Sequence, residues 1–119
     1  MSNKLAVVSI WAENVSAAAH FYRVVVGLHL LEHHGGRPHF DLNGVYLTIL
    51  KGQPVPAKDA VLARFSLMAF AVDDLGAAVA RLQAHSVELP WGIEKDEVSR
   101  WVMFHDPAGN MIELVQFEE

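Results

Sequence analysis

FHDPAGNMIEL, the stretch of residues 104–114, decides the fold of this chain. Pro107 fixes φ near the value that a tight turn needs, and Gly109 supplies a positive φ. Asn110 either tolerates the left-handed conformation or bonds locally. Because β-rich segments precede and follow this turn, the stretch predicts a β-hairpin.

Two amphipathic helices are predicted, and they repeat each other. The first follows Asn14 and ends at Gly27, and the second follows Asp73 and Asp74. Each start offers a side-chain oxygen to the free N–H groups of the first turn. The apolar stripes superpose at a constant shift of 60, with Val15, Ala18, Ala19 and Tyr22 in the first helix and Leu75, Ala78, Val79 and Leu82 in the second.

Strands flank both helices in the same order. Asn43-Gly44 is a second turn signal, and aligning Gly44 with Gly109 gives a shift of 65. The second half is therefore about five residues longer (65 − 60), which fits the polar segment 94–99. The predicted strands are 5–12, 27–32 and 45–50 in the first half and 65–72, 87–91 and 111–115 in the second.

The order of elements predicts an α+β fold of two βαβββ modules. One module cannot cover both faces of its curved sheet, so we expect both to form a curved mixed sheet around a central cavity, with the helices outside. Within this single domain of residues 1–119, module 1 is predicted at about 1–51 and module 2 at about 63–119. The linker at about 52–62 begins with a segment that holds two prolines.

Composition narrows the possible functions. The 119 residues include no cysteine, which leaves out disulfides and thiolate chemistry. The nine Lys and Arg residues are scattered and outnumbered by 14 Asp and Glu, which argues against nucleic acid. No apolar run approaches the roughly 20 residues that cross a bilayer. We therefore expect a cytoplasmic protein that binds neither nucleic acid nor a membrane.

Two motifs resemble those of the glyoxalase/bleomycin-resistance/dioxygenase (vicinal oxygen chelate) superfamily. The ending 104–114 is similar to its DPxGN turn and the strand (I/F)E(L/F) that follows, and AHFYRVVVGL at 19–28 resembles its first helix, FYxxxLGL. Trp91-Gly92 followed by Arg100 is similar to a segment of many small members. The resemblance covers essentially the whole chain. It implies a homodimer in which paired modules complete each cavity, within one chain or across two.

The resemblance also implies four inward-facing positions where metal-using members carry ligands, one on the first and one on the last strand of each module. Here they are Val7 and Leu67, which are 60 apart, and Thr48 and Glu113, which are 65 apart. Only Glu113 is a competent ligand for a divalent ion. We therefore expect no metal and no cofactor, with unusual ligands as the alternative.

Seven histidines were candidate ligands. His33 and His34 precede Gly35-Gly36 and are predicted in a solvated turn. His39 lies on the third strand of module 1, and alternation places it beside Asp41. This side of the strand could face the cavity. The remaining histidines are predicted at the surface or in structural roles, and they are His20, His29, His85 and His105.

Strand alternation predicts an apolar, partly aromatic lining that suits an apolar or aromatic small molecule. Burial of Glu113 there would raise its pKa unless a cation compensates, and Arg100, His39 or a cationic ligand are candidate partners. Trp91 and Trp101 are expected in the core, with closure over a ligand as the alternative. The predicted ligand-binding residues are Ser9, Trp11, His39, Tyr46, Thr48, Leu67, Arg100, Trp101, Met111 and Glu113.

Three functions follow from this lining. The favoured one is a metal-free protein that binds or sequesters a small molecule, similar to the drug-sequestering members of the superfamily. The second is a lyase, isomerase or oxygenase, either metal-free with Glu113 as catalytic acid or base or with unusual metal ligands. The third is a regulatory binding module. The simpler explanation for the presence of Glu113 is that it makes a structural hydrogen bond or ion pair.

Overall fold

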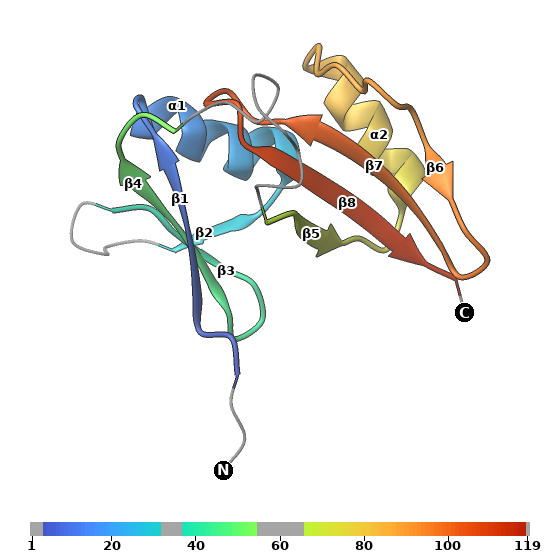
Figure 1. The fold of residues 1–119 in the computed structure, drawn as a ribbon, viewed down its shortest axis with the longest axis horizontal. Coiled ribbons are helices and arrows are strands. Elements are labelled where there is room, and N and C mark those ends of the chain that lie inside the picture. Colours follow the sequence, from blue (N-terminus) through green and yellow to red (C-terminus); the bar gives the residue numbers. More distant parts are fainter. Residues whose placement is uncertain (1–3, 32–36, 55–65, 119) are drawn as a thin grey trace. The chain divides into compact units, whose positions relative to one another are not determined.

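The computed structural model describes residues 4–31, 37–54 and 66–118, and the chain divides into two compact units, Met1–Pro54 and Val55–Glu119. We call them unit 1 and unit 2. In its described residues, each unit holds one helical segment and one four-stranded mixed sheet (Figure 1), so the predicted α+β fold of two repeated modules is confirmed. Most of the predicted linker, together with His33 and His34, lies outside the described residues.

The elements of both units follow the predicted order of strand, helix and three strands. Unit 1 consists of β1 (Val7–Ala12), α1 (Val15–His20), the π-helix η1 (Phe21–Val26), β2 (His29–Leu31), β3 (His39–Asp41) and β4 (Tyr46–Lys51). Unit 2 consists of β5 (Met68–Ala71), α2 (Leu75–Ala84), β6 (Glu94–Lys95), β7 (Ser99–His105) and β8 (Met111–Phe117).

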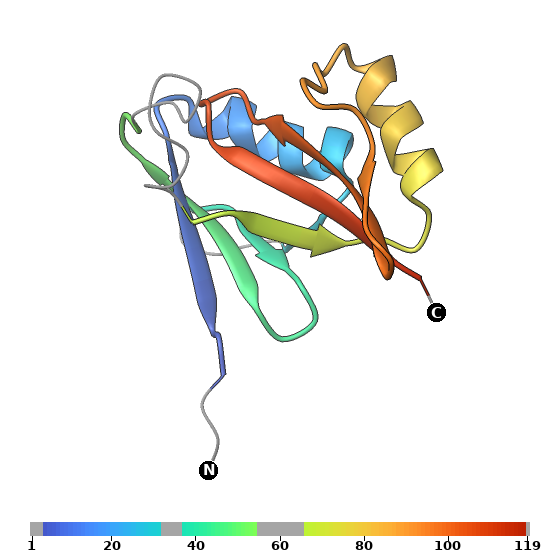
Figure 2. The same ribbon diagram turned by 45° about the vertical axis from the view of Figure 1, so that its right-hand side comes forward.

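Both sheets have the same topology. The strand order is β1-β4-β3-β2 in unit 1 and β5-β8-β7-β6 in unit 2. In each sheet the first and last strands of the unit pair in parallel, and the other neighbours are antiparallel. The parallel pair of unit 1, β1 beside β4, and that of unit 2, β5 beside β8, can be followed in Figure 2. A parallel pair needs a crossover, and each helix lies within that crossover.

The helix boundaries follow from their caps. The Asn14 side chain accepts a hydrogen bond from the backbone N–H of Ala17 at 3.0 Å, and the Asp74 side chain accepts one from Ala77 at 3.0 Å. Gly27 ends the first helical segment with φ 89°. Before it, α1 passes into the wider η1, a change that the stripe of Val15 to Tyr22 does not reveal.

Each unit has its own apolar core between its helical segment and one face of its sheet. In unit 1, α1 packs against β1 and β4, and in unit 2, α2 packs against β7 and β8. Among the described residues, no helix is long and apolar enough to span a membrane. The largest fully buried side chains are Tyr22, Phe40, Leu47 and Ile49 in unit 1 and Leu75, Leu82, Val102, Phe104, Ile112 and Leu114 in unit 2.

The two turns form as their residues predict. Asn43 and Gly44 have φ of 59° and 95°, as the tight hairpin between β3 and β4 requires. Gly109 has φ 89°, and the turn that contains it joins β7 to β8. Asn110 bonds locally rather than adopting a positive φ, because its backbone N–H and its side-chain amide both donate to the Asp106 carboxylate.

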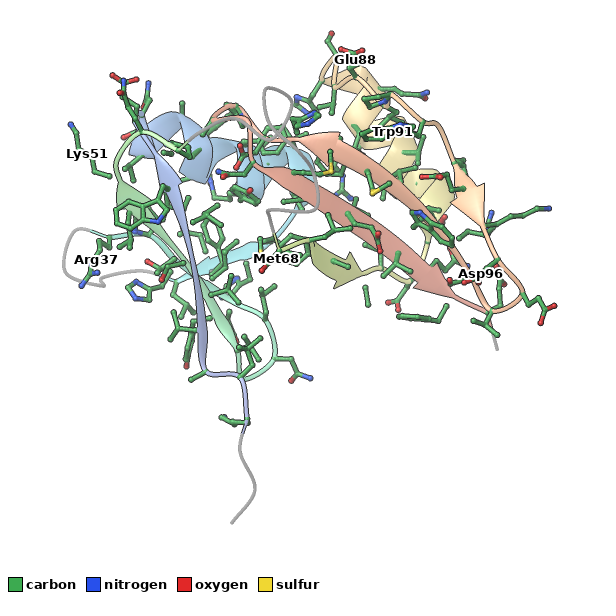
Figure 3. All side chains as sticks on the ribbon, viewed as in Figure 1. Arg37, Lys51, Met68, Glu88, Trp91 and Asp96 are labelled. Atoms are coloured by element: carbon green, nitrogen blue, oxygen red, sulfur yellow. The ribbon has the colours of Figure 1, made fainter. Side chains whose placement is uncertain are left out.

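The predicted strand 87–91 is wrong. Pro90 has no N–H to donate to a ladder, and the Gly92 N–H donates to the Leu89 carbonyl at 3.1 Å, so this segment forms a turn. The strand is β6, only two residues long, inside the segment predicted as an insertion. Hydrogen bonds from the Val98 N–H and then from Ser99 hold the pKa of Asp96 below its ordinary value in the turn that follows β6 (Figure 3).

Substitution of Asp106 tests how the β7–β8 hairpin is held. Asp106 is 4% exposed and accepts hydrogen bonds from the Ala108 N–H at 2.9 Å, the Asn110 N–H at 2.9 Å and the Asn110 amide at 3.0 Å. Asp106→Ala leaves these donors without the carboxylate. We expect it to lower the free energy of unfolding by about 2–4 kcal/mol, measured by urea denaturation.

The repeat supplies a matched control for this substitution. Asp41 occupies the equivalent place in unit 1, but it is exposed and its carboxylate is 3.5 Å from the Gly44 N–H. Asp41→Ala should change the stability by less than about 0.5 kcal/mol. Equal losses in the two variants would contradict the assigned role of Asp106.

Candidate functional site

Each unit has its own candidate site, the sheet face that does not carry its helix, and we call this the open face of that unit. In unit 1 the strand register places Ser9, Thr48 and His39 side by side in one row of the open face. Val7, Tyr46 and Asp41 form the next row, and Trp11 lies beside Leu50 on the other side. Apolar side chains remain accessible here, with exposed fractions of 49% for Val7, 50% for Trp11 and 39% for Tyr46.

The polar row of unit 1 is held by hydrogen bonds to the segment before β3. The Thr48 hydroxyl donates to the Pro38 carbonyl at 2.8 Å, and the Thr48 side chain is buried. The His39 Nδ1 atom lies 3.0 Å from the Arg37 carbonyl, a distance suited to a hydrogen bond in which the ring donates. Unit 1 thus presents the exposed Ser9 hydroxyl and an imidazole between exposed aromatic side chains.

The open face of unit 2 carries two carboxylates, Glu113 and Glu94. Glu113 on β8 lies between Ala69 on β5 and Met103 on β7. In the next row, Trp101 lies between Val115 and Glu94 of β6. On the other side of Glu113, Met111 pairs with His105. This face therefore combines Met and Trp side chains, which adapt to flat ligands, with two acidic groups and an imidazole.

Glu113 is held in an environment that disfavours its charge. Desolvation by burial, and next the nearby Glu94 carboxylate, raise the pKa of Glu113 above its ordinary value of 4.5. Lys95 on β6 and Arg100 on β7 lie opposite each other in the strand register, and alternation puts both side chains on the helix side of the sheet. Arg81 lies on α2. Among the described residues of unit 2, these three are the Lys and Arg side chains, so none lies on the open face beside Glu113.

Two residues of this face escaped the sequence analysis. In the described part of the chain, Glu94 Oε1 and His105 Nε2 are buried without a hydrogen-bond partner. Unpaired buried polar atoms are unfavourable unless they serve a function or meet a ligand. Glu94 was obscured because β6 was predicted as a loop, and His105 was predicted to be structural. Strand alternation would place both side chains on the face of Glu113, but it can be applied only when the bounds and register of β6 and β7 are known.

The remaining predicted site residues divide between the faces. Arg100 alternates to the helix side of its sheet and pairs with Glu118, with Nε 2.9 Å from Oε1, rather than with Glu113. Leu67 is 47% exposed and immediately precedes β5. Trp91 is 44% exposed in the segment between α2 and β6 (Figure 3), so its predicted place in the core is wrong. Trp101 is half-buried on the open face rather than in the core.

The four positions that the superfamily uses for metal do not fit a divalent ion. Val7 and Thr48 lie on one face of unit 1 in adjacent rows, and Leu67 and Glu113 belong to unit 2. Val and Leu have no donor atom, and a neutral hydroxyl such as that of Thr48 is a poor ligand for a divalent ion. One carboxylate is too few ligands for such an ion. Over the described ranges, no three His, Asp or Glu side chains are grouped to hold a metal.

The fold and the sequence identify the class of protein. The profile of the Glyoxalase/Bleomycin resistance protein/Dioxygenase superfamily matches residues 4–114. The chain belongs to this superfamily, of which it is a small member of 119 residues.

Solved structures with a similar fold include enzymes and a binding protein. A glyoxalase/dioxygenase from Nostoc punctiforme superposes with a TM-score of 0.84 at 23% identity, over 98% of this chain and 92% of that one. TnmS3, an antibiotic-binding protein from a Streptomyces species, gives a TM-score of 0.78 at 25% identity over 98% of both chains. A lactoylglutathione lyase from Agrobacterium tumefaciens gives 0.73 at 20% identity, over 98% and 95%.

The raised pKa of Glu113 predicts the effect of its removal on stability. A carboxyl group whose pKa is higher in the folded state binds more protons folded than unfolded, so stability falls as pH rises from about 4.5 through the folded pKa. Glu113→Gln removes this penalty. We expect a higher melting temperature than the parent at neutral pH and a smaller difference at acidic pH, measured by thermal denaturation across that range.

The outcome separates a ligand site from a structural role. Glu88→Gln, at an exposed carboxylate in the same unit, is the control and should leave the pH profile unchanged. If Glu113 instead makes a structural hydrogen bond or ion pair, Glu113→Gln will lower the melting temperature at neutral pH.

Proposed function

We propose that the protein binds or sequesters an apolar or aromatic small molecule without using a metal. The observation that carries the proposal is the chemistry of the two open faces, which combine accessible Trp, Tyr and Met side chains with few polar groups. Apolar surface with a few placed polar groups is typical of small-molecule sites. The likeness to the antibiotic-binding TnmS3 supports a binding function. Of the predicted ligand contacts, Arg100 lies on the helix side and is left out of this proposal. The proposed contacts are Ser9, Trp11, His39, Tyr46, Thr48, Leu67, Trp101, Met111 and Glu113.

A divalent-ion titration tests the metal-free part of the proposal. We expect nickel, zinc, iron(II) and manganese to show no stoichiometric binding by calorimetry, because one carboxylate and one hydroxyl at the four family positions are too few ligands. Metal analysis of the purified protein is the companion measurement. Tight uptake of one ion per chain would contradict the proposal and favour a metal enzyme with unusual ligands.

We further propose that the ligand carries a basic group that sits beside Glu113 and Glu94. Desolvation already disfavours the ionised Glu113, and Glu94 adds a second negative charge nearby. Both carboxylates lie on the face that contains Trp101, with Glu94 directly opposite it. A protonated amine would offset both penalties, and an aromatic ring next to it would contact Trp101.

A matched pair of probes tests this charge preference. 9-Aminoacridine is a planar cation at neutral pH, and acridone has the same tricyclic frame without the charge. We expect the cation to bind roughly five- to tenfold more tightly in a fluorescence titration. Glu94→Gln and Glu113→Gln should each reduce that preference, while Glu88→Gln should keep it. Equal affinity of the two probes for the parent protein would refute the basic group.

The second candidate function is a metal-free lyase, isomerase or oxygenase in which Glu113 is the catalytic acid or base. The raised pKa of Glu113 favours it, since a carboxylate that titrates nearer neutrality is a better proton acceptor. Turnover of a substrate that Glu113→Gln abolishes while binding persists would establish this function over pure binding.

We also propose a homodimer, because small members of the superfamily usually dimerise. Light scattering on the purified chain measures the oligomeric state directly.

A further inference from the structure

In unit 1, the Trp11 indole occupies the space in which a side chain at position 52 would lie. Gly52 directly follows Lys51, the last residue of β4 (Figure 3), and Trp11 lies on the neighbouring strand β1. A Cβ atom built on Gly52 would lie 2.7 Å from Cε3 of the Trp11 indole, 3.3 Å from Cζ3 and 3.6 Å from Cδ2. The six-membered ring of the indole thus rests against the glycine backbone.

Position 52 requires a glycine because of the Trp11 indole and not because of its backbone conformation. Among the glycines in the described ranges, those with positive φ are Gly27, Gly44, Gly92 and Gly109, so Gly52 adopts a backbone conformation that alanine shares. What glycine provides at this position is space, and the Trp11 ring occupies it.

Two hydrogen bonds tie residues 52 and 53 to the end of β1 and the residue that follows it. The Gly52 N–H donates to the Ala12 carbonyl at 3.1 Å, and the Gln53 side-chain amide donates to the Glu13 carboxylate at 3.0 Å. Position 52 is therefore tied to the end of β1, the strand that carries Trp11. With its ring against Gly52, Trp11 is 50% exposed on the open face.

We propose that Gly52 is a positioning residue that seats the Trp11 indole as a flat platform on which a planar aromatic ligand stacks. The inference rests on the proposed binding function and adds the ligand class and the residue that prepares its site. A preset ring loses less conformational freedom on binding than a mobile one, which favours affinity. Alanine at position 52 would push the ring away, because an indole turns about its side-chain bonds more easily than the tied backbone moves.

Gly52→Ala is the test, with acridone as the planar probe. We expect its affinity to fall about three- to tenfold, the range of a lost aromatic stacking contact. Trp11→Ala should weaken binding at least as much, and adding Gly52→Ala to Trp11→Ala should have no further effect. The melting temperature of Gly52→Ala should stay close to that of the parent, which a merely structural glycine would not allow.

Gly76→Ala is the matched control. A Cβ atom at Gly76 meets only the Asp74 carboxylate oxygen, at 3.4 Å, on the exposed side of α2. This variant should bind acridone like the parent. Equal affinities of Gly52→Ala and the parent would overturn the inference and leave the proposed function intact.

A measurement without ligand keeps the inference testable if the probe does not bind. In a nitrogen-15 NMR spectrum, the indole N–H signal of Trp11, assigned by its loss in Trp11→Phe, should shift in Gly52→Ala. The signals of Trp91 and Trp101 in unit 2 should stay in place. An unmoved Trp11 signal would refute the positioning role. Failure of acridone to bind the parent protein would instead count against the proposed function.

Discussion

The parallel pairing of the first and last strands of each unit is the constraint on which the rest of the structure depends. It places the two ends of a unit side by side, so the helical segment must lie in the crossover between them. It also fixes which side chains share a row: Ser9 with Thr48, and Ala69 with Glu113. These pairs are related by the same shifts of 60 and 65 that relate the two halves of the sequence. The register is thus duplicated along with the elements.

Most of the fold could be predicted because its signals are local. Caps such as Asn14, the Asn43-Gly44 turn and the Asp-Pro-Ala-Gly-Asn turn specify geometry within a few residues, and the structure forms all of them. Strand alternation then assigned side chains such as Trp11 to the correct face. The strand β6 was missed because its two residues lie in a polar segment whose pairing is fixed by β7 and by the Asp96 turn.

The site was less predictable, since its features depend on contacts between strands. Glu94 enters the environment of Glu113 only through the register of three strands, and no spacing in the sequence signals it. Arg100 illustrates the opposite error. It was predicted as a partner of Glu113, but its side chain lies on the helix side of the sheet and pairs with Glu118. The seat of Trp11 on Gly52 joins residues that are 41 positions apart and is visible only as a distance.

The two units share a topology but differ in the chemistry of their open faces. Unit 1 presents hydroxyls, an imidazole, aromatic rings and the exposed Asp41 carboxylate, whereas unit 2 presents two carboxylates and an imidazole among Met and Trp. In both, the side chains that hold the fold together lie mainly on the helix side. Open-face positions can therefore change without emptying the core. A duplicated chain of this kind can diversify its recognition chemistry one half at a time, while the core of each half stays unchanged.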